Sequence, residues 1–400
     1  MKTTFLIFGI TGDLSRRKLL PALQDIVKLP EGNSIEIVGV SRRDVDVGEL
    51  ITSSTGGDRL VDKTSIVTMN LAELQDYKDL KANLGLDPND QLIVYLSVPP
   101  SAAADIADFL GQVGLNTPNV KIMFEKPFGF DLESAQDFIQ RNGRYFKEAQ
   151  IYRIDHYMAK EVALELVRLR TDPTTPHHAW SNKDIARIEV VASETIGVEG
   201  RADFYEQTGA LRDVIQGHLF QLLSLVLMDT GNNFQFGELP GRRLEALRKL
   251  EVAHPEASVR AQYEGYEDEV SNPGTRTETY AAVTLTSRDS RWSGVDIQVV
   301  AGKSLSEKRT AITIFYKDGT RQEFIEGAVR VDSERPKDGY ERVILEAMKG
   351  EHAIFTTSSE IIRAWEVLAP IQQAWSMEQM PLVMYAPGSS WQTVASTYSK

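Results

Sequence analysis

The sequence predicts two domains of different class: a doubly wound α/β domain over residues 1–153 and an α+β domain with a large, mainly antiparallel sheet over residues 154–400. A chain of 400 residues is long enough for two or three domains, at roughly 150 residues each. In the first part, short apolar runs alternate with helical patterns. In the second part, long helices are mixed with longer runs in which apolar and polar residues alternate in places.

Short apolar runs in the first part predict strands that are buried on both faces, at Phe5–Phe8, Ile35–Val40, Ser65–Met69, Leu92–Leu96, Val120–Phe124 and Ile151-Tyr152. Helical spacing between them predicts helices over Ser15–Val27, bent at Pro21, and over Asp105–Val113 and Leu132–Phe146. Alternating strands and helices indicate a parallel, Rossmann-type sheet, in which ligands bind beyond the carboxyl ends of the strands.

In the second part, helical patterns cover Met158–Arg170, Ala210–Met228, Glu341–Lys349 and Glu360–Trp375. Strands are predicted over Ile185–Ile196, Tyr280–Ser287, Gly294–Val300, Ala311–Tyr316 and Thr320–Phe324. Asp318-Gly319 separates the last two runs and is a hairpin signal, so we expect these two strands to be antiparallel neighbours.

Composition excludes several classes of function. The net charge of −13 argues against a nucleic-acid partner. The absence of cysteine removes thiolate nucleophiles and cysteine-ligated metal sites, and fits a reducing compartment. Thr11-Gly12-Asp13 interrupts the apolar N-terminal run, and the apolar stretch Leu219–Met228 is too short to span a bilayer. We therefore expect a cytoplasmic protein with no membrane partner.

Four clusters of small or polar residues follow strands of the first domain, at Gly9–Gly12, Ser41–Arg43, Ser97–Pro100 and Glu125–Gly129. They should converge at the carboxyl edge of the sheet. The glycines at the first strand-to-helix turn would let the backbone approach a pyrophosphate, although this short motif alone also fits a plain turn. Arg42 at the end of the second strand favours NADP over NAD, because arginine accommodates a 2′-phosphate; the nearby Asp44 leaves NAD open.

Arg16, Arg17 and Lys18 place three cations in the first helical turn, where the helix dipole favours acids. A bound anion would relieve this conflict, and the alternative is a solvated surface run.

The segment Arg153–Glu161 predicts a phosphate site at the start of a helix. His156 and Lys160 are four residues apart and would share one helical face, while Asp155 could cap the helix. Donors gathered at a helix start suit a phosphate dianion. The alternative is a capped surface helix.

His218 lies on the buried face of the helix predicted over Ala210–Met228. A lone histidine there is more often a core residue than a catalyst. As a functional group it would be a general base for a hydroxyl proton, oriented by a carboxylate. Asp155 is the candidate partner, because Asp213, five residues earlier, is too far round an α-helix.

Four stretches together resemble the glucose-6-phosphate dehydrogenase family: Gly9–Leu19, Glu125–Gly129, Arg153–Glu161 and Glu206–His218. The run Arg-Ile-Asp-His-Tyr, followed after two residues by Lys-Glu, is highly specific for that family. The resemblance implies oxidation of glucose 6-phosphate at C1 to 6-phosphoglucono-1,5-lactone, the first step of the oxidative pentose phosphate pathway. Hydride would pass to NADP, with NAD as the weaker alternative, and no metal is required.

Carried over position by position, the resemblance implies that His218 is the general base and Asp155 its orienting carboxylate. Substrate ligands are implied at Lys126, His156, Tyr157, Lys160, Glu194, Asp213, Lys303 and Lys308. Coenzyme contacts are implied at Gly9, Thr11, Gly12, Asp13, Leu14, Lys18, Arg42, Ser97 and Lys126.

The chain departs from the family pattern in three places. Gly217 stands where the family commonly has asparagine, and sequence is missing after Met228 and again between Phe324 and Glu341. In the family the missing regions build part of the large sheet, with the dimer contact and, in some members, a second structural NADP. A homodimer is expected only if the shortened sheet still provides that contact.

Two other functions remain open. A sugar dehydrogenase of the glucose–fructose oxidoreductase and inositol dehydrogenase type would share the two domains and the Glu125-Lys126-Pro127 motif, but would not need a phosphate site at Arg153–Lys160. A non-catalytic sensor of NADP or of a sugar phosphate would fit the shortened sheet and Gly217.

Overall fold

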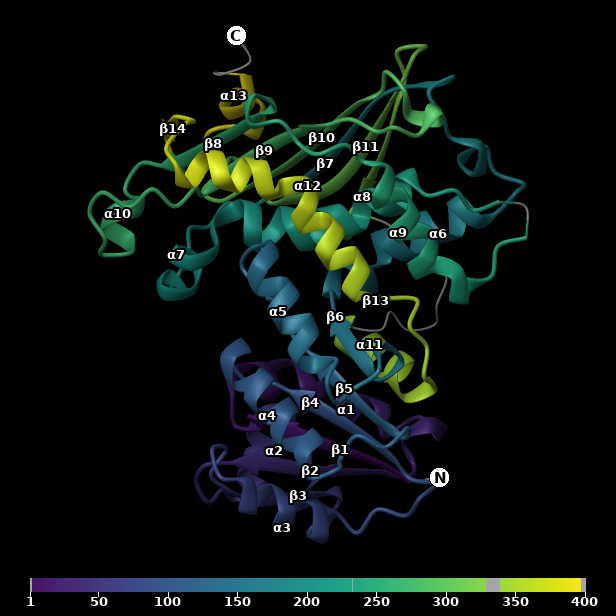
Figure 1. The fold of residues 1–400 in the computed structure, drawn as a ribbon, viewed down its shortest axis with the longest axis vertical. Coiled ribbons are helices and arrows are strands. Elements are labelled where there is room, and N and C mark those ends of the chain that lie inside the picture. Colours follow the sequence, from purple (N-terminus) through teal and green to yellow (C-terminus); the bar gives the residue numbers. More distant parts are fainter. Residues whose placement is uncertain (1, 232, 329–338, 397–400) are drawn as a thin grey trace. The chain divides into compact units, whose positions relative to one another are not determined.

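The computed structural model describes residues 2–231, 233–328 and 339–396. They form two units, drawn as ribbons in Figure 1. The first unit holds residues up to 128, 136–159 and 339–358, and the second holds 129–135, 160–328 and 359–396. Among the described residues, no helix is long and apolar enough to cross a membrane.

The first unit is built on a seven-stranded sheet in the order β13-β6-β5-β4-β1-β2-β3. All neighbouring strands are parallel except β13, which pairs antiparallel with β6. The strands are β1 (Thr3–Phe8), β2 (Ile35–Ser41), β3 (Thr64–Thr68), β4 (Gln91–Leu96), β5 (Val120–Phe124), β6 (Ile151–Ile154) and β13 (Phe355–Thr356). Strand order 3-2-1-4-5-6 is that of a Rossmann fold, so this half of the fold prediction is confirmed.

The parallel strands are connected by the π-helix η1 (Ser15–Leu19), α1 (Leu20–Ile26), α2 (Val47–Thr55), α3 (Leu74–Leu84), α4 (Pro100–Gln112) and α5 (Leu132–Asn142), most of which belongs to this unit. The unit also contains α11 (Gly339–Lys349), which precedes β13 in the chain. β1 and β4 are buried along their whole length because each lies between two other strands and under helices. The predicted strands agree with the observed ones to within three residues at either end.

The second unit has a seven-stranded sheet in the order β12-β11-β7-β10-β9-β8-β14. Only β7–β10 and β8–β14 are parallel pairs, so the sheet is mainly antiparallel, as predicted. The strands are β7 (Ile185–Ser193), β8 (Ser258–Tyr263), β9 (Tyr280–Leu285), β10 (Asp296–Gly302), β11 (Arg309–Tyr316), β12 (Arg321–Ile325) and β14 (Leu382–Tyr385). β11 and β12 form the hairpin predicted at Asp318-Gly319.

The longer helices of this unit are α6 (Glu161–Thr171), α7 (Ala202–Ala210), the π-helix η7 (Leu211–Leu219), α8 (Phe220–Leu227), α9 (Leu239–Lys249) and α12 (Ser358–Ser376); α10 (Tyr266–Glu269) and α13 (Trp391–Ser396) are short. η7 contacts β7, β9 and β10, so it lies against the middle of the sheet. The single helix predicted over Ala210–Met228 is therefore wrong in detail, because a π-helical segment and an α-helix share that span. Sequence was also expected to be missing between Phe324 and Glu341, and residues 329–338 of that segment are outside the described residues.

Candidate active site

The turn after β1 is shaped for close approach of a ligand. Gly9 has a φ of +80°, and a Cβ there would lie 2.2 Å from the main-chain oxygen of Ser97. The Gly12 N–H and the Ser15 hydroxyl each donate to the Gly9 oxygen at 2.9 Å. β4 runs beside β1, which brings Ser97 to this turn from a distant part of the sequence.

The Ser97 hydroxyl supplies a test of whether a dinucleotide fits. Its oxygen is buried, and it has no hydrogen-bond partner within the part of the chain that the structure describes. A buried hydroxyl without a partner costs free energy, so it fits a polar ligand group that would complete its bonding. Together with the bare backbone at Gly9, this matches the expected coenzyme contacts.

Two of the three cations of η1 have bonding partners within the protein. Arg17 pairs with Asp13 at 2.7 Å, and the Arg16 Nε donates to the Thr11 oxygen at 3.0 Å. Whether a bound anion also lies at these cations stays a prediction. Lys18 is exposed, and Leu14 precedes the first residue of η1.

Arg42 is exposed just beyond β2, the strand beside β1. The Gly9 N–H donates to the Val40 oxygen at 3.3 Å, so the two strand ends lie side by side. The 2′-phosphate role of Arg42 stays a prediction.

At the end of β5, the Lys126–Pro127 peptide bond is cis. Glu125, which precedes it, accepts a hydrogen bond from the Tyr95 hydroxyl at the end of β4. Burial raises the pKa of Glu125 to about 7, although the Tyr95 bond favours the carboxylate; the charge of Asp155 adds to the rise. Sequence reasoning gave Glu125 no role, because only the pairing of β4 with β5 brings Tyr95 to it.

The segment after β6 differs from the predicted helix. Residues His156–Ala159 form a 3₁₀ turn, Lys160 is extended, and α6 begins at Glu161. The expectation that His156 and Lys160 share one α-helical face is therefore wrong. Asp155 is buried and accepts the Tyr157 N–H at 3.0 Å, so it bonds to the first residues of the 3₁₀ turn and does not cap α6, whose N-cap residue is Lys160.

His156 and Tyr157 remain a compact donor pair. Both side chains are half-buried, and their ring centroids lie 5.0 Å apart.

In the second unit, Glu194 and Lys303 follow the parallel strands β7 and β10. The register pairs Ser193 with Gly302, so the next residues emerge together and form an ion pair. The Lys303 ammonium also lies 5.3 Å from the ring centroid of Tyr205. Lys308 is exposed in the connection from β10 to β11, where it was expected.

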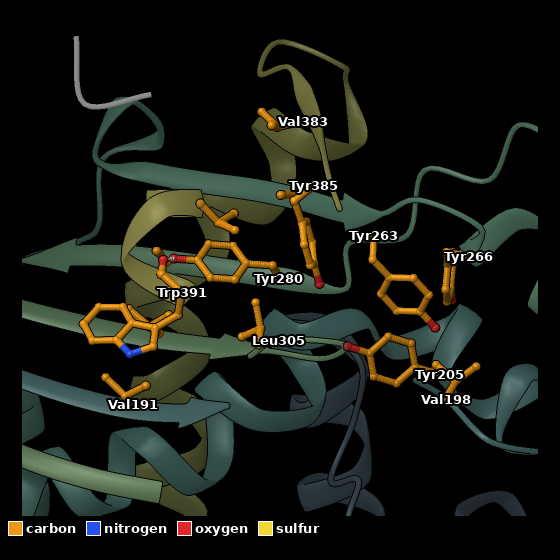
Figure 2. Packing of buried hydrophobic residues seen from close by; sticks show 14 residues of the cluster. Val191, Val198, Tyr205, Tyr263, Tyr266, Tyr280, Leu305, Val383, Tyr385 and Trp391 are labelled. Carbon is orange, nitrogen blue, oxygen red and sulfur yellow. Dashed lines mark hydrogen bonds between the residues drawn. The ribbon is translucent and has the colours of Figure 1, made fainter. Parts of the chain in front are cut away.

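Lys303 contacts a cluster of buried tyrosines, which Figure 2 shows. The Tyr385 hydroxyl donates to the Lys303 main-chain oxygen at 2.6 Å, and Tyr205 packs in the same cluster. These tyrosines come from separate elements of the unit, so no local sequence signal identified them.

Asp213 and His218 both lie on η7, with Asp213 half-buried and His218 buried. Residues five apart are hydrogen-bonded neighbours in a π-helix, unlike in an α-helix. The geometric reason for excluding Asp213 as the partner of His218 therefore does not hold. The pairing of His218 with Asp155 stays a prediction.

Comparison with known proteins covers both halves of the chain. Residues 6–164 match the profile of the glucose-6-phosphate dehydrogenase NAD binding domain, which indicates a nicotinamide cofactor. Residues 167–335 and 326–398 match the C-terminal domain of the same family in two overlapping pieces, as loss of an internal segment would produce.

Full-length relatives agree with this match. The glucose-6-phosphate 1-dehydrogenase of Gluconobacter oxydans (strain 621H) is 29% identical, over 96% of this chain and 93% of the relative. The crystal structure of glucose-6-phosphate 1-dehydrogenase from Mycobacterium avium is 28% identical with a TM-score of 0.85, covering 98% of this chain and 96% of that one. A glucose-6-phosphate dehydrogenase in complex with glucose-6-phosphate has a TM-score of 0.88 at 23% identity, covering 100% and 98% of the two chains, and so shares the fold. The chain belongs to the glucose-6-phosphate dehydrogenase family, whose members are oxidoreductases with a nicotinamide-binding Rossmann domain.

Proposed function

We propose that the protein oxidises D-glucose 6-phosphate at C1 to 6-phospho-D-glucono-1,5-lactone and reduces NADP. The observation that carries this proposal is the match of both halves of the chain to the family, with glucose-6-phosphate 1-dehydrogenases as relatives over nearly the full length. The domain assignment that goes with it is coenzyme binding by residues 1–153 and substrate binding by residues 154–400.

The chemistry needs one base. The C1 hydroxyl loses its proton to the imidazole of His218, and the C1–H bond breaks with its electron pair leaving as hydride. The bound nicotinamide supplies the hydride acceptor. Asp155 orients the imidazole and stabilises the imidazolium that forms, as carboxylates do for catalytic histidines.

The far end of the sugar supplies binding energy. His156 and Tyr157 form a half-buried donor pair, and Lys160 follows Tyr157 by three residues, so these side chains suit a phosphate dianion. A phosphate held away from C1 keeps the reacting hydroxyl in register with the base. The remaining proposed substrate ligands are Lys126, Glu194, Asp213, Lys303 and Lys308.

The coenzyme is proposed to lie along the carboxyl edge of the first sheet. The bare backbone at Gly9 and the buried Ser97 hydroxyl support a pyrophosphate there. An exposed Arg42 at the end of β2 supports NADP, because its guanidinium suits a 2′-phosphate. The remaining proposed contacts are Thr11, Gly12, Asp13, Leu14, Lys18 and Lys126.

The deciding experiment follows the absorbance of reduced nicotinamide with glucose 6-phosphate or glucose and with NADP or NAD. We expect turnover of glucose 6-phosphate with NADP, and a His218→Asn variant should lose kcat by about 10² to 10⁴ while still binding glucose 6-phosphate. His254→Asn, at an exposed position, is the matched control. Preference for glucose would favour the inositol dehydrogenase type, and coenzyme binding without turnover of either sugar would favour a sensor.

A further inference from the structure

The second unit contains a polar cavity that the proposed reaction does not use. It has a volume of about 240 Å³ and lies beside the kink that separates α7 from η7. Its walls come from α7 and η7, from β8, from residues 276–278 and from the end of α12. Three arginines, Arg212, Arg260 and Arg276, line it.

Arg260 is a buried cation whose hydrogen bonds go to main-chain oxygens and whose guanidinium lies 5.9 Å from the ring centroid of Trp375. Its side chain belongs to a residue that is 5% exposed, and its two terminal nitrogens donate to the oxygens of Trp375 at 3.0 Å and Met380 at 3.2 Å. The Nε is buried without a hydrogen-bond partner, and within residues 2–231, 233–328 and 339–396 no carboxylate forms an ion pair with this guanidinium. A buried charge without an ion-pair partner is unfavourable, so an anion bound in the cavity beside Arg260 would be stabilised.

The other two arginines add to this positive charge. Arg212 donates to the main-chain oxygen of Gln207 at 2.9 Å, and Arg276 pairs with Glu378 at 3.3 Å, both near the protein surface. Arg276 lines the same cavity as Arg260. Burial lowers the pKa of Arg260, and the positive charge of Arg276 lowers it further. Glu278 and Glu378 act in the opposite direction without pairing with Arg260.

The carboxylates of the wall are already engaged. Glu206 accepts hydrogen bonds from the Tyr266 hydroxyl at 2.6 Å, from the Asn272 amide at 2.7 Å and from the Thr275 hydroxyl at 2.8 Å. Glu278 accepts the Leu211 N–H at 3.0 Å. Burial raises the pKa of Glu278. Glu206 and Glu278 are therefore occupied as hydrogen-bond acceptors within the protein, and the arginines supply charged donors for a ligand.

We propose that this cavity binds a small oxyanion of the phosphate class, held by the guanidiniums of Arg212, Arg260 and Arg276. Guanidinium groups match the spacing of phosphate oxygens and form strong, charge-assisted hydrogen bonds with them. The site lies at the start of η7, the helix that carries Asp213 and His218, and is separate from the proposed phosphate ligands at His156 and Tyr157. It does not rest on the proposed function.

The test measures phosphate binding to the full chain by isothermal titration calorimetry, without sugar or coenzyme. Inorganic phosphate should bind the native protein, and Arg276→Gln and Arg212→Gln should each weaken this binding at least about tenfold. Both positions are partly exposed, so these variants should fold, which circular dichroism checks. Arg288→Gln removes an exposed arginine and should leave the affinity unchanged.

A Lys160→Gln variant separates the cavity from the proposed substrate phosphate site. Phosphate binding that survives in Lys160→Gln but is lost in Arg276→Gln supports the cavity. Loss in Lys160→Gln with retention in Arg276→Gln, equal affinity in every variant, or no binding to the native protein overturns the proposal. A second titration with glycerol phosphate shows which form of phosphate the cavity prefers. Tighter binding of glycerol phosphate than of inorganic phosphate indicates a phosphate monoester as the ligand, and weaker binding indicates the free phosphate ion.

Discussion

Replacing Gly9 by alanine tests the coenzyme cradle directly. The φ of +80° at Gly9 is unfavourable for any residue with a Cβ, at about 1–2 kcal/mol. The added Cβ would also meet the Ser97 oxygen at 2.2 Å, well inside the 3.0 Å that such contacts respect. The end of β4 must therefore move by most of an ångström. A misplacement of about 1 Å in a site can cost roughly 10²-fold in its function, so we expect NADP affinity to fall by that order.

Gly56 provides a matched control for this variant. It also has a positive φ, +68°, but a Cβ there would meet nothing within 4 Å, so the only cost of Gly56→Ala is backbone strain. Gly12→Ala, at a proposed coenzyme contact, places a Cβ 3.1 Å from the Gly9 oxygen and should weaken NADP less than Gly9→Ala does. NADP binding is measured by calorimetry and the free energy of unfolding by urea titration. If Gly9→Ala bound NADP as tightly as Gly56→Ala does, the cradle would not be the coenzyme site.

Three further variants test other parts of the structure. Arg42→Ala should weaken NADP at least about tenfold and leave NAD unchanged in calorimetry, because it removes charge-assisted bonds to the 2′-phosphate; an unchanged NADP/NAD ratio would contradict that role. Glu360→Gln should lower the free energy of unfolding in urea by about 3–5 kcal/mol, because Glu360 and Arg243 are fully buried and 2.7 Å apart; a loss below about 1 kcal/mol, typical of exposed pairs, would refute this. Burial alone would raise the pKa of Glu148, but the Arg153 guanidinium and hydrogen bonds lower it overall. The ionised Glu148 carboxylate therefore stabilises the fold above its unfolded pKa of about 4.3, and this stabilisation is lost as the pH falls through the lower folded pKa. In Glu148→Gln the free energy of unfolding should therefore fall less steeply as the pH is lowered, and an unchanged pH dependence would count against this role of Glu148.

The sheets could be predicted because their strands are marked by local pattern. Apolar runs identified β1, β4 and β5. β1 and β4 are buried along their whole length, as such a run requires, while β5 is buried except at the half-buried Lys121. α2 was missed, since Gly48 and its run of serine and threonine have low helix propensity. Its ends carry the signals that were overlooked: the Asp46 carboxylate accepts the Glu49 N–H at 2.7 Å, and Gly56 ends the helix in the left-handed region.

The site was predictable to the extent that it follows strand ends. Glycines after β1 and serine after β4 lie where the alternation of strands and helices placed them. Lys303 after β10 was expected only from the family resemblance. The contacts that support them were not predictable, because they join elements distant in sequence. The Tyr95–Glu125 bond depends on the pairing of β4 with β5, and the Tyr385 bond to Lys303 joins residues 82 positions apart.

The sequence did not reveal that the helix carrying His218 is a π-helix. This helix type changes the argument about which carboxylate can pair with His218. At roughly 100° per residue, an α-helix places residues five apart on different faces, which is why Asp213 was set aside as a partner for His218. η7 is a π-helix, in which residues five apart are bonded neighbours. The other π-helix of the described chain, η1, carries the expected coenzyme residue Lys18. π-helical turns are rare and concentrate at functional sites, so their occurrence in these two segments supports both assignments on grounds independent of motif resemblance. The choice of Asp155 over Asp213 as the orienting carboxylate now rests on the family resemblance alone.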